Sequence, residues 1–381
     1  MGTSLRLESR LRSTKLMAVM TIAVIALCLR TAGSVLDHSG ATLVGDVLIV
    51  FGLLIPSLSN ALQLKEMEPA PALSHALFRW AAGIAYVGWT ILCISALWLG
   101  TSAPEGVTWR TALFDPLVAG TGLLWLCVAS AVIALCLILY AIATLSVRLG
   151  YRANRNDSLH QTALTAQAVV TCLCAPILLL VSLLAITERV LHLGIFPAES
   201  TLTIQLGWLA LHPLLLSSLL PVLGLVLDSF GVASGRATRL AQIALWSVAL
   251  CFVLSSGQNA FDAGISELVA ISSSFYALLT CAPLLTLFVM GCEAAARALR
   301  LQPWPMRLRL SALALLVCAA FLLLALRAAL PALSMGFDIV LFGAYGRTLL
   351  LCLVLLGLAL SVSSWGPQRP DSTEQATPSP A

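Results

Sequence analysis

One histidine in the middle of the chain lies where few polar side chains are expected. His212 belongs to an apolar run, 203–227, that is long enough to cross a bilayer. Trp208 precedes it by four residues, Pro213 follows it directly, and Pro221 lies nine residues beyond it. An imidazole at bilayer depth is costly and is a candidate for metal binding or proton transfer. The alternative is a neutral histidine that is hydrogen-bonded between packed helices.

The elements that must position His212 follow from composition. Apolar residues make up 60% of the 381 residues and charged residues only 10%, more apolar surface than a soluble domain could bury. We therefore predict an all-α fold, a polytopic transmembrane helical bundle of about ten helices. Residues 1–15 form a basic N-terminal segment, 16–363 the helical domain, and 364–381 a tail rich in Pro, Ser and Thr that we expect to be disordered.

Ten apolar runs, each close to the length that a membrane span needs, predict these helices. The runs are roughly 16–32, 41–63, 78–100, 117–147, 162–187, 203–227, 238–256, 265–291, 309–330 and 336–363. The first run is similar to a signal peptide, but no clear A-x-A cleavage site follows it, so we expect a retained helix. We find no convincing internal repeat, and few helices broken by Gly or Pro, which disfavours a transporter.

Basic residues support this count of helices. Most of the 21 Lys and Arg residues fall on the side that holds the N-terminus, whereas Arg110, Arg189 and Arg327 fall on the other side. By the positive-inside rule both termini are cytoplasmic. The net charge of +4 comes without a basic patch interleaved with aromatics, so nucleic acid is not an expected partner, and the lipid bilayer is.

The remaining polar residues offer weaker candidates. Most of the 11 cysteines lie in apolar spans as small hydrophobes, and Cys172 with Cys174 is a weak metal signal because i and i+2 point to different helix faces. Serines within the spans, such as Ser217 and Ser218, are expected to bond back to backbone carbonyls. The following residues are read as helix ends, boundaries or solvated loop positions: His38, Asp46, His75, His160, Glu188, Arg189, His192, Asp262, Asp338. Arg347, inside the last span, is expected to form a structural ion pair or to snorkel toward the interface; the alternative is a functional contact with an acidic side chain or a lipid phosphate.

The His212 segment resembles the sixth helix of subunit I of the heme-copper terminal oxidases, in which the histidine of a Trp-x3-His-Pro motif is a copper ligand. Three further stretches resemble other helices of that family in the same order. They are Gly45–Pro56 (second helix), 258–283 with Phe261, Gly264 and Pro283 (seventh and eighth), and Phe337–Tyr345 (entry to the tenth). The resemblance implies an oxidase subunit I-like bundle with ten of the family's twelve helices.

The departures from the family decide the functional hypothesis. Positions of the family's heme ligands fall on Gly45, Leu350 and Cys352, and its second and third copper ligands fall on Gln258 and Asn259. Gly and Leu cannot ligate heme iron, and amides are weak copper ligands. Bound heme and copper are therefore not predicted, and His212 is left as a residual copper-ligand position.

The residues that would handle protons and oxygen are also changed. The glutamate and tyrosine that follow the copper histidine in the family fall on Leu214 and Leu216, and no lysine occurs after Lys65. We therefore expect a non-catalytic protein of the bacterial inner membrane with a scaffold, assembly or regulatory role beside other subunits of a respiratory complex. Two alternatives stay open: a redox protein that binds one heme or copper, for example through His212 and Cys352, and a small-molecule transporter or binder that uses an emptied cavity near His212, Gln258 and Asn259.

Overall fold

The described part of the chain is a bundle of helices. The computed structural model describes residues 72–102, 121–150, 158–192, 201–218, 220–229, 235–256, 275–276 and 278–301, and isolated residues at 25, 28, 44, 45, 47 and 48. The helices are α4 (Ala72–Ser102), α6 (Thr121–Gly150), α7 (Leu159–Leu191), α8 (Thr201–Ser217), α9 (Leu220–Ser229), α10 (Arg236–Leu254) and α12 (Cys281–Leu301). Within these segments there is no strand, so the predicted all-α class is confirmed for them.

Four helices are long and apolar enough to cross a membrane. They cover Leu73–Leu99, Gly122–Arg148, Leu159–Leu191 and Arg236–Leu254, and each coincides with a predicted span. Their backbone groups are satisfied within each helix, as lipid requires. Trp80 and Trp98 are exposed at opposite ends of α4. With a rise of 1.5 Å per residue they lie about 27 Å apart, a separation that suits the two interfaces of a bilayer.

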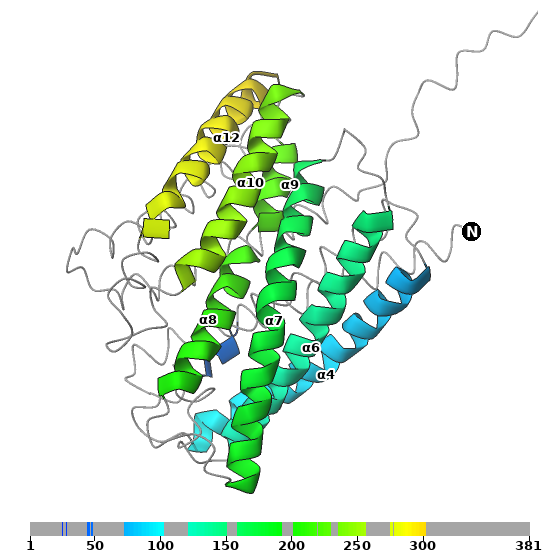
Figure 1. Ribbon diagram of the computed structural model, residues 1–381, viewed down its shortest axis with the longest axis vertical. Coiled ribbons are helices and arrows are strands. Elements are labelled where there is room, and N and C mark those ends of the chain that lie inside the picture. Colours follow the sequence, from blue (N-terminus) through cyan, green and yellow to red (C-terminus); the bar gives the residue numbers. More distant parts are fainter. Residues whose placement is uncertain are drawn as a thin grey trace, which may run out of the picture.

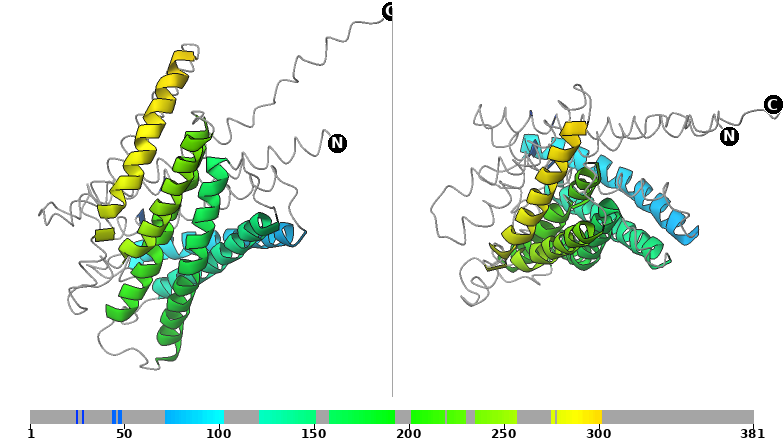
Figure 2. Two further views of the ribbon diagram at one scale, coloured as in Figure 1. Left: turned by 45° about the horizontal axis from the view of Figure 1, so that its top comes forward. Right: turned by 90° about the horizontal axis from the view of Figure 1, so that it is seen from above.

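Helix α7 is the centre of the bundle and contacts α6, α8, α9 and α10 (Figure 1). Figure 2 shows α4 and α6 on one side of α7, with α10 and α12 on the other. Two cross-helix bonds show that α6 and α7 run antiparallel. Ser130 Oγ lies 2.9 Å from Ser182 Oγ, and Arg148 Nε donates to Thr165 Oγ1 at 3.1 Å.

Small side chains let these helices approach closely. Buried alanines line the contacts of α6 and α7, among them Ala129, Ala134, Ala163, Ala166 and Ala175. In lipid, helix association depends on such packing and on interhelical hydrogen bonds, because the tails are as apolar as the side chains. A continuous core of buried leucine, valine and alanine therefore joins the helices around α7.

Two predicted spans differ from the structure. The run 203–227 is two helices, α8 and α9, and α12 extends to Leu301, ten residues past the predicted end of 265–291. Beyond that end the helix continues through Ala and Arg residues of high helix propensity. It carries an exposed i,i+4 pair between Arg297 Nη2 and Glu293 Oε1 at 3.4 Å. The predicted spans 309–330 and 336–363, and the tails, lie outside the described residues.

Candidate functional site

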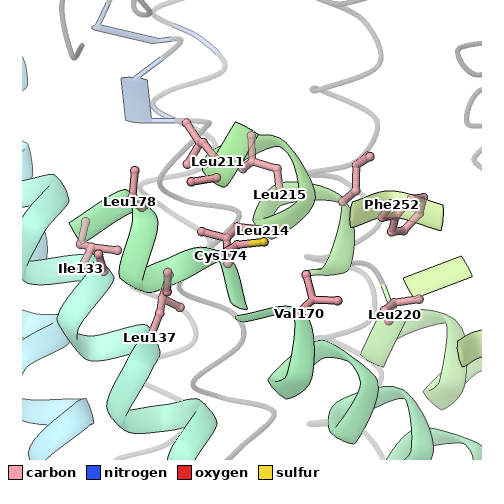
Figure 3. Close-up of a cluster of buried hydrophobic side chains, with 14 of the residues drawn as sticks. Ile133, Leu137, Val170, Cys174, Leu178, Leu211, Leu214, Leu215, Leu220 and Phe252 are labelled. Atoms are coloured by element: carbon pink, nitrogen blue, oxygen red, sulfur yellow. The ribbon is translucent and has the colours of Figure 1, made fainter. Parts of the chain in front are cut away.

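His212 lies in the apolar core. It is only 6% exposed, and Leu211, Leu214 and Leu215 around it on α8 are buried as well. Figure 3 shows these leucines meeting side chains of α6, α7 and α10. The labelled residues are Ile133, Leu137, Val170, Cys174, Leu178, Leu211, Leu214, Leu215, Leu220 and Phe252. The leucines of the histidine segment are thus packed against apolar side chains of three neighbouring helices.

The helix that carries His212 is interrupted one and a half turns later. Helix α8 ends at Ser217 and α9 begins at Leu220, so the expectation of one continuous helix is wrong at this point. Pro221 explains the break, because it has no N–H for the carbonyl of Ser217 and its ring crowds that carbonyl. Prolines do not always have this effect, since Pro213 lies inside α8.

Serine hydroxyls satisfy carbonyl groups near this break. Ser217 Oγ donates to the Leu214 carbonyl at 3.0 Å, and Ser218 Oγ donates to the Leu215 carbonyl at 2.6 Å. The predicted role of these two serines is confirmed. Both side chains are buried, so these bonds satisfy carbonyl groups at the end of α8 without water.

Helix α9 contacts the start of α7 through a carboxylate. Asp228 Oδ1 accepts from the Leu159 N–H at 3.0 Å, and Oδ2 accepts from the His160 N–H at 2.8 Å. The first N–H groups of a helix have no partner within the helix, and a negative charge there interacts well with the helix dipole. Ser158 and Gln161 add a capping box at the same end. Asp228 therefore caps α7 from a different helix.

His160 is the second residue of α7, and the expectation that it is solvated is wrong. Its side chain is 6% exposed, because α9 packs over it. Its Nδ1 lies 3.0 Å from the carbonyl oxygen of Pro221. A carbonyl can only accept, so Nδ1 carries the hydrogen and Nε2 of the neutral ring is an acceptor. That Nε2 is buried and has no hydrogen-bond partner among the residues that the structure describes.

Gly224 permits this contact between α9 and α7. A Cβ at this position would lie 2.7 Å from the Leu159 carbonyl oxygen and 2.8 Å from both the Ala163 Cβ and the His160 Cα. Only glycine allows backbones to approach so closely. Pro221, Gly224 and Asp228 are spaced i, i+3, i+7, which puts them on one face of α9. This face was not predicted, although the spacing of Pro221, Gly224 and Asp228 is present in the sequence.

Other predicted residues are placed singly. Cys174 is buried and Cys172 only partly so, as expected for i and i+2 neighbours. Leu214 and Leu216, at the family's glutamate and tyrosine positions, are both buried. At the far end of α7, Arg189 donates to Cys127 Sγ of α6, and exposed His192 is the left-handed C-cap. His75 is half-buried and Gly45 is helical.

The remaining predicted positions lie outside the described residues. They are His38, Asp46, Gln258, Asn259, Phe261, Asp262, Gly264, Phe337–Tyr345 with Asp338, Arg347, Leu350 and Cys352. Trp208 is helical, but its side chain also lies outside the description. Among the residues that the structure does cover, no three His, Cys, Asp or Glu side chains are grouped as metal ligands would be.

The fold and these contacts define an α-helical, multi-pass membrane protein. No protein-family model matches the chain, and no curated protein matches it at a significant level.

Proposed function

We propose that this chain is a membrane scaffold or regulatory subunit that resembles subunit I of the heme-copper oxidases and acts without oxidase chemistry. In this proposal it has ten helices, both termini are cytoplasmic, and it lies in the bacterial inner membrane beside subunits of a respiratory complex. Its function is then to bind other membrane subunits during assembly or regulation. The proposal rests on the sequence resemblance and on the surroundings of His212.

The observation that supports a non-catalytic role is the packing of the His212 segment. Leu214 and Leu216 stand where the oxidases need groups that transfer protons and cleave oxygen, and both are 6% exposed or less within the apolar core. A leucine can neither donate a proton nor ligate a metal. Copper prefers several imidazole ligands, and among the described residues no three His, Cys, Asp or Glu side chains are grouped as metal ligands would be. The described donor set therefore fits copper poorly.

A second candidate function is favoured by the break between α8 and α9. Discontinuous helices in transporters place helix ends beside a substrate site within the membrane. Here the break adjoins Pro221, whose carbonyl accepts from His160. If the protein is a small-molecule binder or transporter, its binding site would lie in this region, and His212 would carry out no redox reaction.

A reduced-minus-oxidised visible spectrum of the purified protein in detergent, with iron and copper counted on the same sample, tests the main proposal. We expect no Soret band and no stoichiometric metal, and the same result for His212→Ala. One heme or one copper per chain that is lost in His212→Ala would refute the proposal and favour the redox alternative. Native electrophoresis of membranes extracted in mild detergent tests the scaffold role, because the chain should migrate with a respiratory complex and not alone.

A further inference from the structure

We propose that α9 is a proton-sensitive latch, closed onto the start of α7 by neutral His160 and released when that imidazole takes up a proton. The inference is independent of the oxidase resemblance. It rests on three contacts between α9 and the first turn of α7: the Asp228 carboxylate on two N–H groups, His160 Nδ1 on the Pro221 carbonyl, and the close approach at Gly224.

The latch has a hinge. Helix α9 is ten residues long, and Ser218, which follows the end of α8 at Ser217, is a turn residue that belongs to neither helix. A helix segment that is not continuous with its neighbour can move by changing the backbone angles of a few residues. Because all three contacts lie on one face of α9 and within its ten residues, a single rotation about this break would release them together.

The closed arrangement accommodates the neutral imidazole only. Nδ1–H is used by the Pro221 carbonyl, and Nε2 is buried with no partner among the described residues. A proton added at Nε2 would create a cationic N–H donor that has no acceptor there, which is costly in a buried place. Nε2 is the remaining acceptor of the neutral ring, so a proton is the species that it can take up.

The open arrangement removes that cost. Helix α7 has 33 residues, so it is about 50 Å long and exceeds a hydrocarbon core of about 30 Å. Its first turn therefore lies near headgroup level, where water can solvate an imidazolium once α9 moves away. Protonation and opening are then linked: the open form binds one more proton, so acid favours it.

Asp228 is the charged group in contact with His160. It accepts from the His160 backbone N–H, and its negative charge opposes release. The other charged or histidine side chains described on the helices packed against α7 are Arg148 of α6, which donates to Thr165, His212 of α8, and exposed Arg236 and Arg239 of α10. The cysteines and the tyrosine described on these helices are all buried: Cys127, Cys136, Tyr140 and Cys251.

The size of the effect follows from the linkage. An exposed imidazole has a pKa of about 6.5, so between pH 8 and pH 5.5 the opening equilibrium should increase about tenfold if only the open form binds the proton. Hydrogen–deuterium exchange of the purified full-length protein in detergent measures this directly. After correction for the intrinsic pH dependence of exchange, peptides that cover α9 and the first turn of α7 should lose about tenfold protection at pH 5.5. Peptides from the middle of α6 should not change.

His160→Asn is the test variant, because its amide can donate to the Pro221 carbonyl and does not titrate. We expect its α9 protection, whatever its level, to be independent of pH. His192→Asn is the matched control: it makes the same change at the exposed, left-handed C-cap of the same helix, where asparagine is well tolerated, and it should keep the wild-type response. His160→Gln is used if His160→Asn does not fold. Wild-type protection that is equal at both pH values, or an acid response that persists in the His160 variant, would overturn the latch.

Discussion

Replacement of Gly224 by alanine should separate α9 from α7. The new Cβ would lie 2.7–2.8 Å from the Leu159 carbonyl oxygen, the Ala163 Cβ and the His160 Cα. Two of these atoms are backbone, so no side-chain rotation relieves the clash. Restoring ordinary contact requires a movement of about 0.7–1 Å, which would stretch the two Asp228 bonds from 3.0 and 2.8 Å past the limit for a hydrogen bond.

The magnitude combines three terms. Overpacking costs about 1–3 kcal/mol, weakened bonds to a charged acceptor add about 1–2 kcal/mol, and the higher helix propensity of alanine returns about 1 kcal/mol. We expect a net loss of about 1–4 kcal/mol in the closure of α9 on α7. Thermal unfolding of the protein in one detergent, followed by tryptophan fluorescence, should show a lower midpoint, and hydrogen exchange should show the loss of protection in α9.

Gly83→Ala is the matched control for this change. Gly83 lies in α4, and a Cβ there would meet nothing within 4 Å. The same substitution should therefore be neutral or slightly stabilising, because only the propensity term remains. An unfolding midpoint for Gly224→Ala that equals or exceeds both the wild type and Gly83→Ala would refute the close-approach argument.

Two further changes test the contacts of α7. Ser130→Ala removes the buried bond to Ser182 and should cost about 0.6 kcal/mol of stability, a typical value for an interhelical bond in a membrane protein. In thermal unfolding, the double variant Ser130→Ala/Ser182→Ala should lose little more stability than either single variant. A fully additive loss would contradict a shared bond. Asp228→Asn keeps the size of the side chain but removes its charge and one acceptor oxygen. The amide hydrogens of the first turn of α7 should therefore exchange about tenfold faster, in keeping with the loss of about 1–2 kcal/mol. Unchanged amide exchange there would show that the carboxylate is dispensable.

Four of the ten predicted membrane helices are confirmed within the described residues, because one physical rule determines them. Lipid offers no hydrogen-bond partners for backbone groups, so every apolar run that crosses the membrane must be helical. The runs that form α4, α6, α7 and α10 are helical as this rule requires. The break after α8 could not be predicted from its proline alone. Pro176 and Pro213 lie inside helices that continue, whereas Pro221 follows two serines whose hydroxyls satisfy carbonyls near the break.

The site at the start of α7 was harder to predict, because its members are far apart in the chain. His160 was expected to be solvated because it lies at a helix end. A residue at a helix end is solvated only where no other element packs over that end. Asp228, 68 residues away, reaches its backbone N–H, and a lone acid after an apolar run gives no hint of that partner. His160 is buried because α9 packs over it, and this packing cannot be read from the sequence of α7.

The break and the latch depend on each other. Asp228 can reach Leu159 and His160 only if α9 lies against α7 along the face that carries Pro221, Gly224 and Asp228. A continuous α8–α9 helix would fix the direction of that face through the packing of α8 against the core around Leu211 and Leu215. The break after Ser217 frees α9 from this constraint, so α9 can align on Gly224 while α8 remains packed. The break that lets α9 close onto α7 also allows it to open. For this reason one buried imidazole at the contact face, that of His160, can control the position of α9.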